Sequence, residues 1–269
     1  MTEIPLDAVG VQHEPAGSDA RIVSLVPSIT ELLFDLDLGE QIVGRTQFCV
    51  HPASLVDDVP SLGGTKKINM ERLRDLNPTH VILNIDENTK ALAREIGKTV
   101  PNIIVTHPMV PRDNIDLFRL MGGIFRREAG ADKLCTEFDK ALRAVSVASR
   151  RSRERRVLYF VWKDPWMTVS RNTYIARMLD IIRWRTILND PAVRYPKVEI
   201  TKSVLSKADV LLFSSEPYKF TEDDIEDFRE TYGCGSKTLR LVDGEMISWY
   251  GSRVIKGLEY LQTLSAGRT

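Results

Sequence analysis

The sequence predicts an α/β protein of two Rossmann-like parallel-sheet lobes joined by one long bridging α-helix. The first observation is that short apolar, β-branched runs alternate with segments whose apolar residues recur every three to four positions. The second is residues 128–153, which contain no proline and place Leu134, Phe138, Leu142 and Val145 on one helical stripe. A helix there would span roughly 30 Å, enough to bridge two lobes.

A repeated order of elements supports two similar lobes. Residues 69–84 and 199–214 both read as helix, turn and strand. We therefore divide the chain as follows: a flexible N-terminal lead-in (1–20), an N-terminal α/β lobe (21–127), the bridging helix (128–153) and a C-terminal α/β lobe (154–269).

The N-terminal lobe opens with the apolar strand 22–26, which ends at Pro27. Ser28 and Glu31 fit a capping box for a helix that Gly39 closes. A long loop, rich in turn residues, covers 47–69. The other predicted elements are strands at 41–46, 80–84 and 102–106, and helices at 70–76, 88–96 and 114–126.

The C-terminal lobe follows the same scheme. Its apolar runs predict strands, and its periodic segments predict helices. The predicted strands are 156–162, 209–215 and 238–242, and the predicted helices are 173–184, 202–208, one beginning at Glu222 and one beginning at Arg253.

Composition limits the classes of function. Lys plus Arg and Asp plus Glu both number 37, so the chain lacks the basic face that nucleic acids or anionic membranes need. Three cysteines without a C-x-x-C pair argue against a disulfide framework and a structural zinc site. No secretory signal and no apolar stretch of about 18 residues is evident. We therefore expect a soluble cytoplasmic protein without a transmembrane segment.

Unusual residues concentrate in the loops that follow the strands, where open parallel sheets bind ligands. Aromatic side chains in such loops suggest the wall of a cleft for a flat, partly apolar ligand, although they could also cap the ends of the sheets. The candidate ligand-binding residues are Phe48, His51, Lys66, Trp162, Trp166, Tyr195, Glu216, Trp249, Tyr250 and Arg253.

Several motifs together resemble a known family. The segments SLVPSITELLFDLDLGEQIVGRT and NMERLRDLNPTHVIL, with FCVHP, GGTKK, PWMTV, SSEPYKF and WYGSR, are similar to the class III periplasmic binding proteins, and especially to their helical backbone metal receptor, cobalamin-binding-like branch. The resemblance implies a solute-binding protein that requires no cofactor, does not turn its ligand over, and holds it in a cleft between two lobes. The implied ligands are cobalamin or another corrinoid, haem, or a ferric siderophore.

The resemblance also implies a partner, the permease of an ABC importer. Family members carry one glutamate on each lobe that pairs with arginines of the importer's membrane subunits. Glu71 matches the first of these positions, whereas Lys202 occupies the second, with Glu199 nearby. Lys202 therefore puts permease docking in doubt.

The residues leave other chemistries open. Cys49 and His51 could supply two metal ligands, or form a nucleophile pair, but no third partner is evident. The strand-end acids Glu216, Asp243 and Glu245 could serve an enzyme on the same scaffold, or act as helix caps. The glycine turn 63–67 could bind an anion, and Arg253 could bind an anion or brace Asp243 or Glu245.

Overall fold

The computed structural model describes residues 4–190 and 192–266. The chain forms two compact units: unit 1 is Met1–Pro108, Arg112–Phe138 and Tyr250–Arg253, and unit 2 is Met109–Pro111, Asp139–Trp249 and Val254–Thr269. Each unit takes a short segment from the other half of the chain, so the division is not a simple cut in the sequence.

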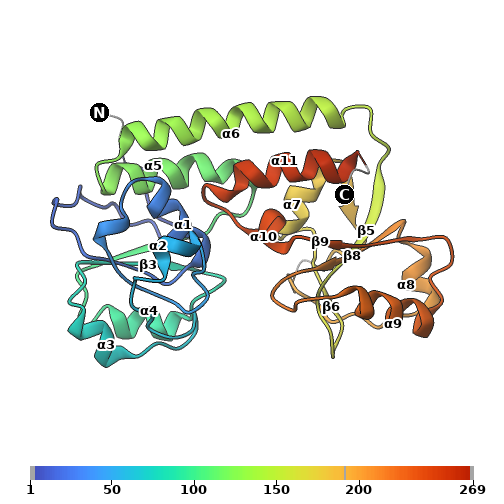
Figure 1. Cartoon of the computed structure of the whole chain (residues 1–269), viewed down its shortest axis with the longest axis horizontal. Coiled ribbons are helices and arrows are strands. Elements are labelled where there is room, and N and C mark those ends of the chain that lie inside the picture. The colour runs from blue at the N-terminus through green and yellow to red at the C-terminus, as the bar shows by residue number, and fades with distance from the viewer. Residues whose placement is uncertain (1–3, 191, 267–269) are drawn as a thin grey trace. The chain divides into compact units, whose positions relative to one another are not determined.

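Unit 1 contains a four-stranded parallel sheet in the order β2-β1-β3-β4 (Figure 1). Its apolar core consists of residues such as Val23, Val81 and Leu92, which come from strands and from a covering helix. The elements of unit 1 are β1 (Ile22–Ser24), α1 (Pro27–Asp35), η1 (Gly39–Gln41), β2 (Ile42–Arg45), α2 (Ala53–Val56), α3 (Met70–Asp75), β3 (His80–Asn84), α4 (Lys90–Ile96), β4 (Asn102–Thr106) and α5 (Asn114–Ile124), with η2 (Pro111–Asp113) at its boundary.

Unit 2 contains a five-stranded sheet in the order β6-β5-β8-β9, with β7 also paired to β5. Every pair is parallel except β5 with β6. The elements are β5 (Arg155–Trp162), β6 (Met167–Thr168), α7 (Tyr174–Ile181), β7 (Trp184–Thr186), α8 (Lys202–Ser206), β8 (Val210–Ser214), α9 (Glu222–Tyr232), β9 (Thr238–Val242), α10 (Gly244–Ser248) and α11 (Arg253–Ser265). The predicted α/β class with parallel-sheet lobes is therefore confirmed.

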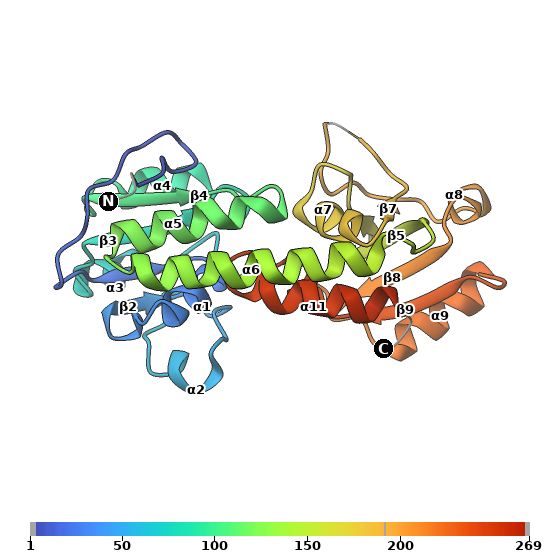
Figure 2. The ribbon, with the colours of Figure 1, turned by 90° about the horizontal axis from the view of Figure 1, so that it is seen from above.

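Helix α6 (Glu128–Ser149) belongs to both units, which divide it after Phe138. The four apolar residues of its predicted stripe are all buried. Figure 2 shows α5 beside the first part of α6 in unit 1 and α11 beside its last part in unit 2. Gly122 permits the first of these contacts, because a Cβ there would lie 2.5 Å from the Cβ of Ala131.

The N-terminal segment packs on unit 1 where composition suggested a flexible lead-in. The buried Asp7 carboxylate accepts hydrogen bonds from the backbone N–H groups of Val9, Val11 and Val105, and it pairs with His13 at 3.1 Å. These contacts satisfy a buried carboxylate and give residues 4–20 a defined path. Residues 1–3 of the predicted lead-in lie outside the described residues.

Two local expectations differ from the structure. Ser28 and Glu31 do not form a capping box, since α1 begins at Pro27 with Val26 as its uncapped N-cap. The helix predicted at 173–184 ends at Ile181, because Arg183 adopts the left-handed conformation (φ 63°) and the chain then continues as β7.

Candidate ligand-binding site

In unit 1, one buried amide joins the loops at the carboxyl ends of β1 and β3. Asn88 Nδ2 donates to the carbonyl oxygens of Leu25 (3.2 Å) and Thr65 (2.7 Å), and Asn88 Oδ1 accepts from the N–H of Asn84. Thr65 belongs to the predicted glycine turn 63–67. This side chain therefore fixes the glycine turn against the end of the sheet.

Phe48 lies beside this turn and remains 51% exposed. A Cβ on Gly64 would lie 3.7 Å from the Phe48 ring, so the FCVHP and GGTKK motifs meet here. Val50 and Ile85, in the loops after β2 and β3, are also exposed. Three apolar side chains are thus open to solvent on loops at the carboxyl ends of the unit 1 strands.

Cys49 is enclosed in the interior of unit 1. Its side chain is fully buried, and its Sγ lies 3.1 Å from the Thr30 hydroxyl and 3.2 Å from the Thr46 hydroxyl. Burial raises the pKa of this thiol, which disfavours the reactive thiolate. In the described part of the chain, no three His, Cys, Asp or Glu side chains gather closely enough to hold a metal ion. The direct metal site on Cys49 and His51 therefore gains no third ligand.

His51 and Lys66 lie on the same loops. His51 is half-buried and Lys66 is exposed. The Gly64 N–H donates to the Lys67 carbonyl at 3.0 Å, so the turn uses this amide to close itself. The anion site expected at 63–67 would therefore depend on its lysine side chains rather than on this amide.

Residues 250–253, which include the predicted site residues Tyr250 and Arg253, belong to unit 1. Arg253 forms a bidentate ion pair with Glu31, at 2.7 and 2.9 Å, and the two side chains are only 6% and 8% exposed. Tyr250 donates to Glu87 at 2.5 Å, and the Gly251 N–H donates to Asn114 at 2.7 Å. Arg253 and Tyr250 are therefore buried, and each is hydrogen-bonded to a carboxylate of unit 1.

In unit 2, two predicted aromatic residues are open to solvent. Trp162, at the end of β5, is 40% exposed and packs edge-to-face with Tyr218 at 5.8 Å. Tyr195, in the loop after β7, is 39% exposed, and its neighbour Val193 is exposed as well. Backbone hydrogen bonds from Ser170 and Thr168 fix this loop against the strand-end segment.

Trp166, also predicted to bind the ligand, is half-buried and packs against the aromatic core of unit 2. Its ring stacks on Phe220 at an interplanar angle of 3° and contacts Phe160 and Phe228. Its indole N–H donates to the Tyr232 hydroxyl at 3.1 Å. The aromatic rings of the unit 2 core therefore hold Trp166 in place.

Glu216 follows the end of β8 and is half-buried. Its Oε1 accepts from the Ser248 hydroxyl (2.6 Å) and from the Trp249 indole N–H (2.8 Å). Burial raises the pKa of this carboxyl group, and the carboxylates of Glu245 and Asp243 act in the same direction. Trp249 is itself buried, so its indole N–H holds the Glu216 carboxylate in a fixed position. Asp243 caps α10 by accepting from the Met246 N–H, as the helix-cap alternative predicted.

The sequence pointed to Phe48, Trp162 and Tyr195 but not to the exposed apolar residues Val50, Ile85 and Val193. Ile85 follows a predicted strand directly, so its position was a usable signal. Val50 and Val193 had no such signal, because nothing in a loop sequence separates an exposed apolar side chain from a buried one.

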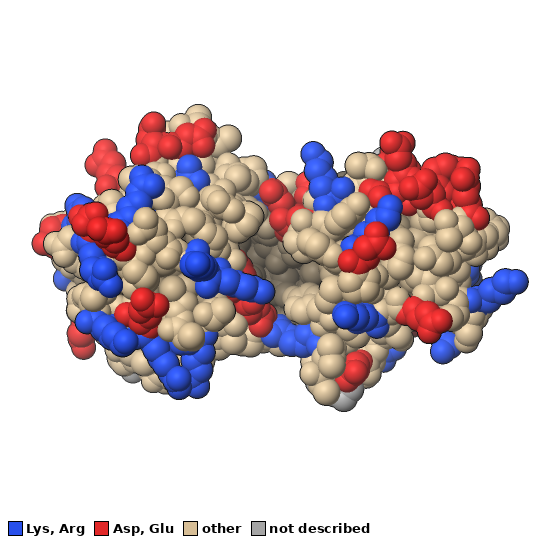
Figure 3. Space-filling model, turned by 90° about the horizontal axis from the view of Figure 1, so that it is seen from below, with Lys and Arg blue, Asp and Glu red and all other residues tan. Residues whose placement is uncertain are grey.

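The two expected docking positions are exposed on short helices. Glu71 lies in the first turn of α3, and Lys202 is the first residue of α8. Basic and acidic side chains are both spread over each unit on the face drawn in Figure 3. None of the helices described here is both long enough and apolar enough to span a bilayer.

Comparison with known proteins supplies the family. The model of the periplasmic binding protein family matches residues 22–233. The vitamin B12-binding protein of Vibrio cholerae serotype O1 is 24% identical over 199 residues, which cover 73% of this chain and 70% of the relative. An uncharacterized ABC transporter substrate-binding lipoprotein of Bacillus subtilis (strain 168) is 24% identical over 265 residues, covering 94% of this chain and 81% of the relative.

Solved structures share the fold. The periplasmic vitamin B12-binding protein of Vibrio cholerae superimposes with a TM-score of 0.79 at 19% identity, covering 92% of this chain and 97% of that one. A periplasmic heme-binding protein from Roseiflexus sp. RS-1, in apo form, gives a TM-score of 0.78 at 21% identity, covering 93% and 99%.

These matches correct one prediction. We expected a cytoplasmic protein from the N-terminal sequence, but the family and its curated relatives are periplasmic binding proteins and a lipoprotein, so that expectation is wrong. The expectation of a binding protein without enzymatic activity is confirmed by the same matches. Since the family model covers most of the chain, this protein belongs to the periplasmic binding protein family.

Proposed function

We propose that this protein binds a corrinoid, another tetrapyrrole or a similar metal chelate and releases it unchanged. The observation that carries the proposal is the exposure of Phe48, Trp162 and Tyr195 on strand-end loops. Aromatic side chains lose hydrophobic stabilisation when they remain in water, so such exposure on ordered loops favours a role in binding. A flat macrocycle offers these rings a large apolar face.

The chemistry of the loops favours a chelate over a bare ion. No cluster of three potential metal ligands exists among the described residues, and Cys49 is enclosed by hydroxyl groups. A chelated metal brings its own ligands and needs only shape, apolar contact and a few polar groups from the protein. The relatives described as vitamin B12-binding and heme-binding proteins support this class.

Glu216 and Lys66 would add polar selectivity. Glu216 is held rigidly by Ser248 and Trp249, so it can accept a hydrogen bond from a ligand amide or hydroxyl without being reordered. Lys66 is exposed and can reach an anionic substituent as a mobile point charge.

The test is a thermal-shift panel with cobalamin, cobinamide, haem and several ferric siderophores, followed by titration of any ligand that binds. A ligand at 100 times its dissociation constant adds about 2.7 kcal/mol to the free energy of unfolding. Phe48→Ala and Trp162→Ala should each weaken binding by about 2 kcal/mol, roughly thirtyfold.

Val147→Ala is the matched control, because Val147 is an equally exposed apolar residue on α6, away from the strand ends. It should leave affinity unchanged. If no ligand of the panel raises the melting temperature, the proposed ligand class is wrong. If a ligand binds equally well to Phe48→Ala and Trp162→Ala, only the assigned site is wrong.

We further propose that the protein delivers its ligand to an ABC importer, as the substrate-binding lipoprotein relative suggests. Glu71 is the expected contact in unit 1, and Lys202 would weaken the corresponding contact in unit 2. Glu71→Ala should lower cellular uptake of the ligand while leaving its affinity unchanged, and Lys202→Glu should raise uptake. Unaltered uptake in both variants would exclude this docking mode.

A further inference from the structure

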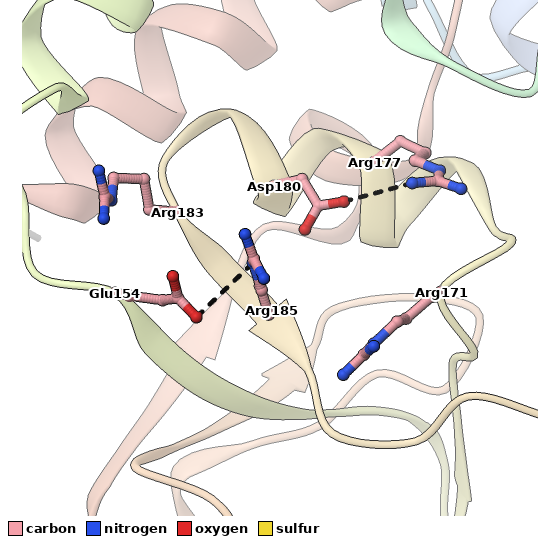
Figure 4. A pocket seen from close by; sticks show the side chains of 6 residues that line it. All are labelled: Glu154, Arg171, Arg177, Asp180, Arg183 and Arg185. Carbon is pink, nitrogen blue, oxygen red and sulfur yellow. Dashed lines mark ion pairs between the residues drawn. The ribbon is translucent and has the colours of Figure 1, made fainter.

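Unit 2 contains a hollow lined entirely by charged residues. Its volume is about 530 Å³, and it lies where α7 and β7 meet the start of β5. The lining residues are Glu154, Arg171, Arg177, Asp180, Arg183 and Arg185 (Figure 4). Glu154 precedes β5 and Trp162 ends it, so about 26 Å of strand separates these two residues. None of the aromatic residues of the proposed chelate site lines the hollow.

The hollow carries an excess of positive charge. Four guanidinium groups face two carboxylates, which leaves two positive charges. Arg185 pairs with Glu154 and Arg177 pairs with Asp180, both at 3.6 Å. Charge-assisted hydrogen bonds are usually 2.7–2.9 Å long, so both pairs are loose. Either arginine can therefore turn toward a stronger anion at little cost.

Among the described residues, the hydrogen bonds of the other two arginines in the hollow go to backbone oxygens. Arg171 Nε donates to the Thr186 carbonyl at 3.2 Å, and Arg183 Nη1 donates to the Arg150 carbonyl at 3.4 Å. A guanidinium group has five N–H donors, so each retains donors for a ligand. Figure 4 shows Arg171 and Arg183 outside the two ion pairs, on either side of Arg185.

Arg183 also occupies an unfavourable backbone position. Its φ of 63° follows the end of α7, where glycine or asparagine is the usual residue. Arg126 has the same conformation after α5, and its Nε donates to the Ala16 carbonyl at 2.9 Å. The short hydrogen bond of the Arg126 side chain thus offsets its backbone strain. The hydrogen bond of the Arg183 side chain is longer and offsets less of the strain at that position.

We propose that this hollow binds the phosphate groups of a small polyanion. Planar guanidinium groups recognise phosphate bidentately, and four of them line the hollow from two loops, one helix and one strand. All six lining residues are charged, which suits a compact polyphosphate better than a nucleotide whose base needs an apolar or aromatic wall. The competing explanation is that the arginines only protect β7, which pairs with a single strand, from association with other strands.

Titration calorimetry with pyrophosphate at about 50 mM salt tests the proposal, because low salt preserves exposed charge interactions. Pyrophosphate should bind with measurable heat and acetate should not. In a parallel arm, vesicles containing phosphatidic acid test whether the phosphate group belongs to a lipid. Binding of pyrophosphate supports a free ligand, binding of vesicles alone supports a lipid headgroup, and binding of neither overturns the proposal.

Two variants and one control make the test specific. Arg183→Asn keeps a residue that tolerates the left-handed backbone, and Arg185→Gln keeps a polar side chain of similar length. Each should weaken binding about tenfold while leaving the thermal midpoint unchanged or, for Arg183→Asn, slightly raised. Arg143→Gln removes the same charge from an exposed site on α6 and should have no effect. Equal losses in all three variants, or no loss in the first two, would show that the hollow is not the site.

Discussion

At the scale of single residues, burial decides which candidate side chains can act. Phe48, Trp162 and Tyr195 are open to solvent, while Trp166 is half-buried against the core of unit 2 and Trp249 is buried. Glu216 lies between these groups, since it is half-buried just after the end of a strand. Its protonation is therefore coupled to folding.

The pH dependence of stability tests this coupling. Burial raises the folded-state pKa of Glu216 above its ordinary value of 4.5, so the folded state holds the proton more tightly than the unfolded state. Its contribution to stability is therefore largest below pH 4.5 and is lost as pH rises through the folded-state pKa. Glu216→Gln, which keeps an acceptor for Ser248 and Trp249, should match the wild type below pH 4.5 and be the more stable protein above the raised pKa.

Urea unfolding from pH 4 to pH 8 measures this difference. Glu259→Gln is the control, since Glu259 is an exposed residue of α11 in the same unit. It should show no pH-dependent gap of this kind. A gap for Glu216→Gln that stays constant across the range would mean that burial does not shift this carboxyl group.

At the scale of elements, one ion pair fixes the beginning of α11. Arg253 opens that helix and pairs with Glu31 of α1, with both side chains almost fully buried. Removing one partner of a buried pair leaves an uncompensated charge, which costs about 3–5 kcal/mol. Replacing both partners by apolar residues of similar volume is often close to neutral.

Arg253→Met should therefore lower the free energy of unfolding by about 3–5 kcal/mol, and the double variant Glu31→Leu/Arg253→Met should recover most of that loss. Denaturant unfolding monitored by circular dichroism gives both values. As a control, Arg229→Met breaks the exposed pair with Glu226 and should cost at most about 1 kcal/mol. A double variant as unstable as the single one would show that the pair itself is required.

At the scale of the whole molecule, the two units share parts. Helix α6 runs through both, unit 1 includes Tyr250–Arg253, and unit 2 includes Met109–Pro111. Unfolding either unit would therefore remove a piece of the other. We expect one cooperative transition instead of two.

The tryptophans allow this expectation to be measured. All four, Trp162, Trp166, Trp184 and Trp249, belong to unit 2, so their fluorescence reports on that unit alone, while circular dichroism reports on both. The two unfolding midpoints should coincide in denaturant. Arg253→Met, which lies in unit 1, should move both midpoints equally, and separate midpoints would show that the units unfold independently.

The sequence predicted most of the fold because its signals are local. The run at residues 80–84 matches β3 and the run at 238–242 matches β9, since apolar, β-branched stretches form buried strands wherever they occur. Strands β6 and β7 were missed because two or three residues carry no periodicity. The cytoplasmic expectation failed because it rested on the N-terminal segment, and only comparison with the family corrected it.

The sequence by itself determined the α/β class, the repeated order of elements, the helix α6 and the likeness to periplasmic binding proteins. The tertiary structure alone decided which aromatic residues face solvent and which partner each charge takes. Arg253 finds Glu31 across 222 residues of chain, and Trp166 packs against rings from β5, β8 and α9. Such contacts depend on how distant segments pack, and the residues next to a side chain in the sequence do not specify them.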